Sequence, residues 1–155
     1  MAGKVTAVPK GYHNVTPYLV VRDAAKAIDF YKEAFGAEEL LRMPAPGGKI
    51  GHAELKMGDA HVMLSDEWPE TGAFAPKKGE RPPVSILLYV DDVDATFEKA
   101  VKAGAKAIRP VENQFYGDRS GQIEDPAGHV WAVATHVEDV TPEELGRRAK
   151  EMFGG

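Results

Sequence analysis

Val20-Val21-Arg22-Asp23 is the stretch that decides the fold of this chain, because Tyr89-Val90-Asp91-Asp92 repeats it in outline. Asp23 and Asp92 lie 69 positions apart, and each stands directly before a segment with helical spacing of apolar residues. A duplicated strand–helix–strands unit in 155 residues predicts two small modules that face each other. The natural ligand site is then the cleft between the modules.

The repeat continues beyond its opening stretch. Phe35-Gly36-Ala37 returns as Ala103-Gly104-Ala105, with the two Gly-Ala pairs 68 positions apart. The run from Gly58 to Leu64 returns, more loosely, over residues 126–133. The offset therefore slips by one residue along the repeat, which leaves the alignment of the last strands uncertain by one position.

Composition excludes several classes of function. The net charge of −5 and the pI near 5.5 argue against nucleic-acid binding, which needs a basic surface. The chain has no cysteine, so disulfides, thiolate catalysis and Fe–S clusters are excluded. No apolar run approaches the ~20 residues that span a bilayer, and the start of the chain, Met1 to Lys4, lacks the apolar core of a signal peptide. We therefore expect a cytoplasmic protein with no membrane partner.

The spacing of apolar residues and turn signals predicts the elements of the first module. Asp23 is a good N-cap, and Gly36 is suited to close the helix that follows it. The expected elements are a strand over Val15–Val21, a helix over Ala24–Phe35, and strands near Glu38–Met43, Ile50–Met57 and Ala60–Ser65.

The second module is expected to repeat this order. Asp66–Pro83, rich in Pro, Gly, Lys and Glu, is interpreted as a linker or mobile flap before it. Thr141-Pro142-Glu143-Glu144 places Thr, Pro and Glu at the N-cap, N1 and N3 positions of a final helix that extends to about Phe153. The expected elements are a strand over Val84–Val90, a helix over Val93–Ala103, and strands near Ala107–Val111, Gly121–Glu124 and His129–Thr135.

The order of these elements predicts an α+β fold of two βαβββ modules. Their mostly antiparallel sheets pair to form one cleft-bearing domain over residues 13–136, with module one at 13–66 and module two at 84–136. Residues 137–155 form a C-terminal helical extension. One face of each sheet is covered by its helix, and the other faces are expected to form the ligand cavity, unless large side chains fill it.

Several short motifs resemble those of one known superfamily. They are Ala27-Ile28-Asp29-Phe30-Tyr31 with Phe35-Gly36-Ala37, then Tyr89 to Asp94, Ala103-Gly104-Ala105 and Asp125 to Trp131. In this order they resemble the vicinal oxygen chelate superfamily, which includes glyoxalase I, bleomycin- and fosfomycin-resistance proteins and extradiol dioxygenases. Phe115 to Arg119, with Ala134-Thr135-His136, is similar to its PhnB-like, glyoxalase-related branch. The resemblance covers residues 13–136 and implies the fold more strongly than the function.

The resemblance implies a test for a metal site. Metal-bearing relatives place ligands on the first and last strands of each module, and here those positions fall on Thr16, Ser85, Met63 and Ala132. None of these side chains holds a divalent ion firmly, and a shift of one residue improves nothing. We expect neither a metal nor another cofactor, although His52 and Glu54 would supply two ligands if a third came from elsewhere.

His52 and Glu54 are the candidate catalytic residues, because two residues apart on a strand they point to the same face. His52 would act as a base for proton transfer and Glu54 would orient it. The alternative is a structural pair without a catalytic role. Asp118-Arg119 is similarly open: Arg119 would clamp an anionic substrate, or would pair with Glu124 or Asp125.

Strand alternation predicts a mostly apolar ligand site with a few hydroxyl groups. The candidate ligand-binding residues are Thr16, Tyr18, His61, Met63, Ser85, Leu87, Tyr89, Tyr116 and Ala132. We therefore expect a metal-independent protein that binds a hydrophobic or aromatic small molecule. The alternatives are a lyase or isomerase that uses His52 and Glu54, with or without a metal, and a silent structural relative. The resemblance also implies a homodimer.

Overall fold

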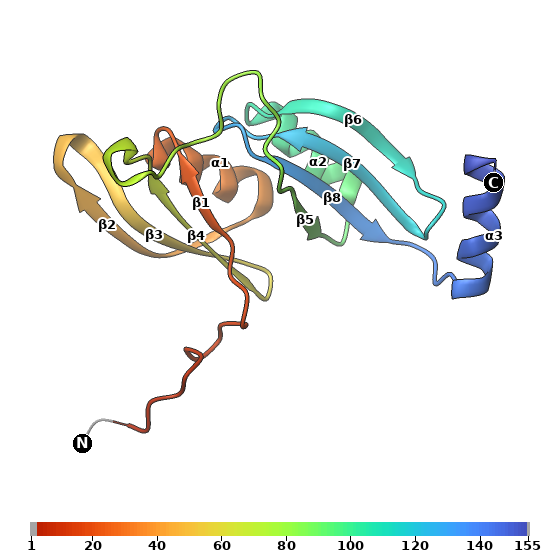
Figure 1. The fold of residues 1–155 in the computed structure, drawn as a ribbon, viewed down its shortest axis with the longest axis horizontal. Coiled ribbons are helices and arrows are strands. Elements are labelled where there is room, and N and C mark those ends of the chain that lie inside the picture. Colours follow the sequence, from red (N-terminus) through yellow and green to blue (C-terminus); the bar gives the residue numbers. More distant parts are fainter. Residues whose placement is uncertain (1–2, 155) are drawn as a thin grey trace. The chain divides into compact units, whose positions relative to one another are not determined.

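The computed structural model describes residues 3–154 (Figure 1). Met1, Ala2 and Gly155, which is the last residue of the expected C-terminal extension, lie outside the described residues. The chain divides into two compact units, with the division between Lys77 and Lys78. No helix within residues 3–154 is both long and apolar enough to cross a membrane.

The first unit contains a strand, a helix and three further strands, as the sequence predicts. Within residues 3–77 the four strands form one sheet in the order β1-β4-β3-β2, in which β1 and β4 are parallel and the other neighbours antiparallel. The elements are β1 (Tyr18–Val21), α1 (Ala24–Phe35), β2 (Glu38–Ala45), β3 (Lys49–Met57) and β4 (Ala60–Asp66), with a 3-10 turn over Pro46–Gly48.

The second unit repeats this arrangement. Within residues 78–154 the four strands form a sheet in the order β5-β8-β7-β6, with one parallel pair, β5 and β8. The elements are β5 (Ile86–Tyr89), α2 (Val93–Lys102), β6 (Lys106–Asn113), β7 (Asp118–Glu124), β8 (Val130–His136) and α3 (Pro142–Phe153). The α+β class, the two duplicated modules and the C-terminal helix are thereby confirmed, and each sheet is mixed.

The first residues of α1 and α2 make equivalent hydrogen bonds, so the duplication extends to the way each helix begins. The backbone N–H of Ala24 donates to Oδ1 of Asp66 at 2.9 Å, and the backbone N–H of Val93 donates to Oγ1 of Thr135 at 2.9 Å. Both donors and both acceptors are 69 positions apart. Each helix therefore starts at the end of its module's last strand, although one acceptor is a carboxylate and the other a hydroxyl.

Both first strands are shorter than the sequence predicts. β1 begins at Tyr18 rather than Val15, because Pro17 has no N–H to donate to a ladder; its carbonyl still accepts from the N–H of Met63. β5 begins at Ile86 rather than Val84, three residues after Pro83. Thr16 and Ser85 therefore precede their strands.

The interpretation of Asp66–Pro83 as an unstructured linker is wrong in its first half. Asp66 ends β4, Pro69–Thr71 forms a 3-10 turn, and Trp68 forms a β-bridge with Ala73. The carboxylate of Glu67 accepts a hydrogen bond from the N–H of the buried Ala75. The burial of Ala75 and the bridge of Trp68 depend on contacts that an interpretation based on the Pro, Gly and charged residues of this segment misses.

Candidate site on the helix-free face of the first sheet

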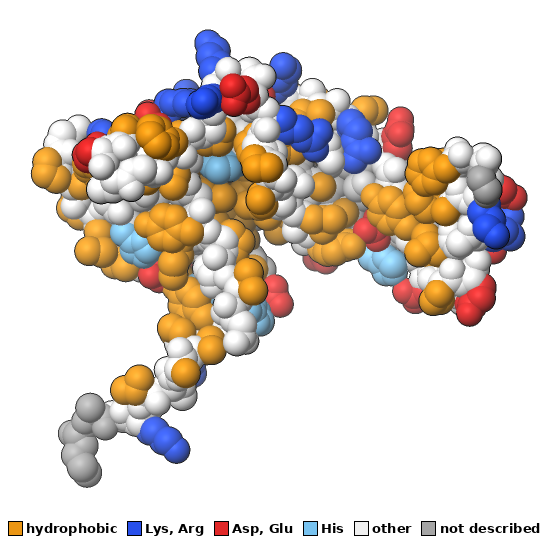
Figure 2. All heavy atoms as spheres, viewed as in Figure 1, with side chains coloured by type: hydrophobic (Ala, Val, Ile, Leu, Met, Phe, Trp, Pro, Cys, Tyr) orange, Lys and Arg blue, Asp and Glu red, His pale blue; other side chains and the backbone are white. Residues whose placement is uncertain are grey.

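The sheet of the first unit has one face under α1 and one face without a helix. Along β3, the buried Ala53, Leu55 and Met57 alternate with three less buried polar residues, His52, Glu54 and Lys56. Successive side chains of a strand point to opposite faces, so these polar residues lie on the face that α1 does not cover. We call this the helix-free face. In the view of Figure 2, hydrophobic and histidine side chains gather over β3 and β4.

Three neighbouring strands place Tyr18, Met63 and Glu54 in one row across the helix-free face. Met63 is the register partner of Tyr18 on β1 and of Glu54 on β3. Tyr18 is 49% exposed, so its ring is open to a ligand. His52, two residues before Glu54, extends along the same face toward Tyr18. The structure thus brings three candidate residues that are distant in sequence into one cluster.

Both ring nitrogens of His52 have partners. Nδ1 lies 2.9 Å from the hydroxyl of Tyr18, and Nε2 lies 3.1 Å from Oε1 of Glu54. The hydroxyl of Tyr12 and the ring of His52, in this order of importance, lower the pKa of Glu54. Its ionised carboxylate can only accept, so Nε2 of His52 carries the donated hydrogen. In the tautomer with its single hydrogen on Nε2, Nδ1 is the acceptor for the Tyr18 hydroxyl.

Tyr12 completes this cluster, and sequence reasoning missed it. Its hydroxyl donates a hydrogen bond to Oε2 of Glu54, and this bond raises the pKa of Tyr12 to about 12. Its ring stacks on the imidazole of His61, with the ring centroids 3.8 Å apart and the planes 18° apart. Tyr12 stands in a polar, irregular segment before the predicted domain start at residue 13, so no periodic pattern signals its role.

His61 lies under the Tyr12 ring and is 9% exposed. Its Nδ1 is buried and has no hydrogen-bond partner among the described residues. A buried polar atom without a partner costs free energy relative to its hydrated state, and most such atoms in proteins are paired. His61 is therefore a site at which an additional polar group would be stabilised.

The second unit has no equivalent polar cluster at the same positions of its described residues. Leu87 and Gln122 are both register partners of Ala132, so Leu87, Ala132 and Gln122 form the row that corresponds to Tyr18, Met63 and Glu54. Ser120 stands two residues before Gln122, as His52 does before Glu54. The duplication thus supplies the framework twice, but the Tyr–His–Glu arrangement belongs to the first unit.

The second unit carries a different polar cluster around Asp118. The hydroxyl of Tyr89 donates to Oδ2 of the buried Asp118 at 2.7 Å, which raises the pKa of Tyr89. Nδ1 of His136 lies 2.8 Å from Oδ1 of Asp118, and Nε2 lies 2.7 Å from Asp139. Tyr89 is 58% exposed and Leu87 50%, so this sheet offers an open apolar surface beside a fixed charge.

The structure also shows the contacts of two other residues that the sequence singled out, Arg119 and Tyr116. Arg119 forms a two-pronged ion pair with Asp94 of α2, with nitrogen–oxygen distances of 2.8 and 2.9 Å, rather than with Glu124 or Asp125. Asp94 is the nearer partner because α2 packs on β7. Tyr116 is an exposed turn residue whose ring makes an edge contact with Phe115.

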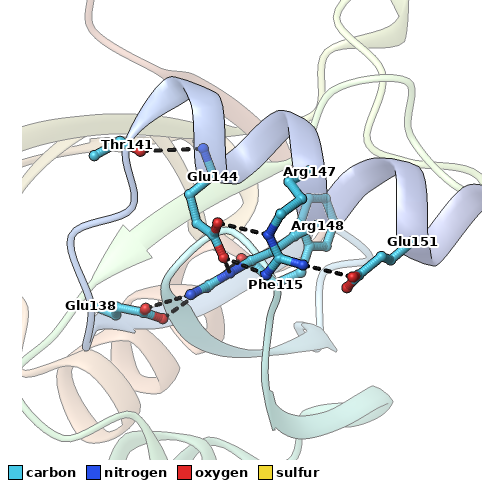
Figure 3. Close-up of polar contacts among 7 residues, drawn as sticks. All are labelled: Phe115, Glu138, Thr141, Glu144, Arg147, Arg148 and Glu151. Carbon is cyan, nitrogen blue, oxygen red and sulfur yellow. Dashed lines mark hydrogen bonds and ion pairs between the residues drawn. The ribbon is translucent and has the colours of Figure 1, made fainter.

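The C-terminal helix is attached next to this turn (Figure 3). Arg148 donates to the backbone oxygen of Phe115 at 3.1 Å and to the carboxylate of Glu138 at 2.7 and 2.9 Å. It also donates to Glu144 of the same helix, and the ring of Phe153 contacts Phe115. No described residue of α3 is buried, so these surface contacts hold the helix in place.

The residues at the superfamily's metal-ligand positions do not fit a metal ion. Tyr18 pairs with Met63 and Leu87 pairs with Ala132, which fixes the 69-residue alignment of the last strands that the sequence left uncertain. With Thr16 and Ser85 at the first-strand positions, the set consists of two hydroxyls, a thioether and a methyl group, none of which binds divalent ions firmly. Within residues 3–154, no group of three or more His, Asp or Glu side chains is placed to hold a metal.

Comparison with known proteins defines the class. A sequence model of the Glyoxalase/Bleomycin resistance protein/Dioxygenase superfamily matches residues 11–133. The chain belongs to this superfamily, and the resemblance inferred from its motifs is confirmed. The match begins at Gly11, so it includes Tyr12.

Particular relatives share this fold over most of their length. An uncharacterised protein of Mycobacterium bovis is 44% identical over 134 residues, which are 84% of this chain and 88% of that protein. The crystal structure of TioX from Micromonospora is 29% identical with a TM-score of 0.62, over 81% of this chain and 99% of that one. A PhnB protein from Bacillus cereus, 16% identical with a TM-score of 0.62 over 79% and 99% of the two chains, shares the fold alone.

Proposed function

We propose that this protein is a metal-independent small-molecule-binding protein of the glyoxalase/bleomycin resistance type. Its ligand is hydrophobic or aromatic and rests on the helix-free face of the first sheet. The observation that carries the proposal is the asymmetry of the duplication. Tyr18, His52 and Glu54 form a hydrogen-bonded cluster on an open surface, where the second unit has Leu87, Ser120 and Gln122.

The side chains on this face suit such a ligand. An exposed tyrosine ring supplies a flat apolar surface, and its hydroxyl, an imidazole and a carboxylate supply a few fixed polar groups, which is the usual composition of small-molecule sites. The side chains of Thr16, Met63, Ser85 and Ala132, which are poor ligands for a divalent ion, support metal independence. The homodimer and the cytoplasmic location expected from the sequence belong to the same proposal.

The second unit provides a matched test of this site. Tyr18→Leu, His52→Ser and Glu54→Gln each introduce the residue that the other sheet carries at the equivalent position, so each fits the framework. We expect compounds from an aromatic library to raise the melting temperature of the native protein, because a ligand that binds only the folded state stabilises it. Each of the three variants should need at least a tenfold higher compound concentration for the same rise in melting temperature. Lys26→Ala, an exposed position on the helix that covers the other face of the sheet, should respond as the native protein does.

The proposal fails if no compound stabilises the native protein, or if the three variants respond as the native protein does. Light scattering of the native protein gives its mass in solution, and a monomer would contradict the homodimer. Elemental analysis of protein purified without chelator tests metal independence, and a stoichiometric divalent ion would contradict it.

A second candidate function is proton transfer by a lyase or isomerase. The hydrogen bonds from Tyr18 to His52 and from His52 to Glu54 support it, because the same order of hydroxyl, imidazole and carboxylate activates nucleophiles and bases in enzymes. In this arrangement the Tyr18 oxygen takes the proton from a C–H bond of the ligand as its own hydroxyl proton passes to His52. The electron pair of that bond remains on the ligand, and Glu54 stabilises the imidazolium.

The two functions are distinguished by exchange of a ligand proton. A bound ligand with an acidic C–H next to a carbonyl should exchange that hydrogen for deuterium in D2O faster with the native protein than with Tyr18→Phe or His52→Ala. If every ligand that binds keeps its hydrogen in all three proteins, the enzyme reading is wrong and the binding function stands.

A further inference from the structure

Tyr12 holds its position through its side chain rather than through its backbone. It lies outside every helix and strand, and Figure 1 shows the N-terminal segment leaving the sheet of its own unit as a thread. Its backbone N–H donates to Pro9 in the same segment. Residues 3–7 are exposed, and His13 adds one surface contact of 3.3 Å to the backbone oxygen of Asp59. Displacement of the Tyr12 side chain would therefore leave the sheet intact.

The contacts of this side chain are those of a bound phenol. The ring lies flat on the imidazole of His61, the hydroxyl donates to the carboxylate of Glu54, and His52 lies on the other side of that carboxylate. Gly11 lies beside the same ring with a φ of 85°, a conformation that favours glycine, and a Cβ added there would make an ordinary contact of 3.6 Å with His61. A free small molecule with the same ring and hydroxyl would make the same contacts.

We propose that Tyr12 occupies the ligand subsite of the helix-free face, and that the ligand is a planar aromatic compound with a hydroxyl donor that displaces it. The proposal rests on the proposed small-molecule function and names its substrate class. Tyr12 then acts as a built-in competitor that lowers the apparent affinity, since a ligand reaches the subsite only in the fraction of molecules from which Tyr12 has moved away.

His61 supports this assignment independently. Its buried Nδ1 has no partner among the described residues while Tyr12 covers the ring. Tyrosine has one polar group on its ring, and that group is engaged by Glu54. Hydrogen bonds to an imidazole nitrogen lie near the plane of its ring, so a ligand with a polar substituent that reaches the edge of this imidazole would gain a hydrogen bond that Tyr12 does not make.

The test uses 4-methylphenol, which reproduces the Tyr12 side chain, as the probe. In Tyr12→Ala, calorimetry should show that 4-methylphenol binds at least tenfold more tightly than it binds the native protein. 4-Methylanisole, which has no donor, should bind Tyr12→Ala at least tenfold more weakly than 4-methylphenol. Adding Glu54→Gln to Tyr12→Ala should weaken 4-methylphenol binding, because an amide is a poorer acceptor than a carboxylate. Phe153→Ala, which removes an exposed aromatic ring on the C-terminal helix, should behave as the native protein.

A second measurement does not depend on the variants. Nuclear Overhauser effects between the rings of Tyr12 and His61 should disappear when the native protein is saturated with 4-methylphenol. The inference is wrong if those effects persist at saturation, or if folded Tyr12→Ala binds the probe no better than the native protein does. If the inference fails but library compounds still stabilise the native protein and lose this effect in the Tyr18, His52 and Glu54 variants, the proposed function is not contradicted. The absence of any bound compound in any variant would contradict both.

Discussion

His136 lies between two carboxylates, with its Nδ1 2.8 Å from Oδ1 of Asp118, at the end of the strand that leads to the C-terminal helix. Asp118 and then Asp139 raise the pKa of His136 above its ordinary value of 6.5. Because the folded-state pKa is higher than the unfolded one, the stabilisation is fully present below pH 6.5 and is lost as the pH rises through the folded-state pKa.

A titration of His136 is therefore the first prediction. Its imidazole signals in NMR should titrate above pH 6.5, and Asp118→Asn should lower the pKa more than Asp139→Asn does. Asp118 is the larger cause because it is buried, whereas Asp139 is exposed. His136→Gln should reduce the fall in the free energy of unfolding above pH 6.5. A titration midpoint of His136 at or below its ordinary pKa of 6.5 would contradict its pairing with Asp118 and Asp139.

Glu54→Gln should release Tyr12, which is the second prediction. The hydrogen bond to Glu54 raises the pKa of Tyr12 to about 12, so its loss should return the pKa toward the ordinary value of 10.0. Ultraviolet absorbance of tyrosinate follows this change, and Tyr12→Phe assigns the signal. Glu39→Gln is the control, because Glu39 pairs with Lys32 and Arg42 rather than with a tyrosine. An unchanged Tyr12 pKa in Glu54→Gln would show that the bond does not form in solution.

The same bond affects stability in acid. The Tyr12 hydroxyl and the His52 ring lower the pKa of Glu54, so its contribution to folding is present above the ordinary value of 4.5 and is lost as the pH falls through the lower folded-state pKa. Glu54→Gln should therefore flatten the pH dependence of the unfolding free energy in this range. If the unfolding free energy of Glu54→Gln changes with pH as steeply as that of the native protein, the pKa of Glu54 is not lowered in the folded state.

Gly117→Ala should destabilise the fold, which is the third prediction. Gly117 has a φ of 101°, and a Cβ there would lie 2.2 Å from the backbone oxygen of Glu138. Backbone strain and overpacking together should lower the free energy of unfolding by about 2–4 kcal/mol in chemical denaturation. Gly146→Ala is the control, because its Cβ would meet no atom within 4 Å. Equal effects of the two substitutions would be inconsistent with this close approach.

Arg148→Ala should detach the C-terminal helix without unfolding the sheets, which is the fourth prediction. Arg148 contacts Glu138 and the backbone of Phe115, whereas Arg147 bonds to Glu144 and Glu151 within the helix (Figure 3). Hydrogen exchange over residues 142–153 should rise more in Arg148→Ala than in Arg147→Ala. Exchange in the strands should stay at the native level, because no described residue of α3 is buried. Faster exchange throughout the second unit would assign α3 a larger structural role.

The helices were the most predictable part of the fold, because their signals are local. Asp23 and Gly36 mark the ends of α1, and Thr141 begins α3 as its capping pattern indicates. Strand starts and the segment after β4 were less predictable. Whether Val15 pairs or Ala75 is buried depends on neighbours that are distant in sequence.

The candidate site was predictable only in part. Strand alternation predicts that Tyr18, His61 and Met63 share the free face and that His52 and Glu54 share a face with each other. That the two groups lie on the same face comes from the register of β1, β3 and β4. The position of Tyr12 had no sequence signal, since its ring and hydroxyl contact residues 42 and more positions away. The ion pair of Arg119 was misassigned for the same reason, because its partner Asp94 lies on another element.

The sequence by itself determined the duplicated module, its order of elements and which side chains stand at the superfamily's metal positions. These follow from periodicity, capping residues and side-chain chemistry, which are properties of short stretches. Only the tertiary structure decided that one sheet carries a Tyr–His–Glu cluster where the other carries Leu, Ser and Gln, and that Tyr12 bonds to Glu54 of this cluster and stacks on His61. Cross-strand register and the docking of an irregular segment depend on contacts between residues far apart in the chain, which no local pattern encodes.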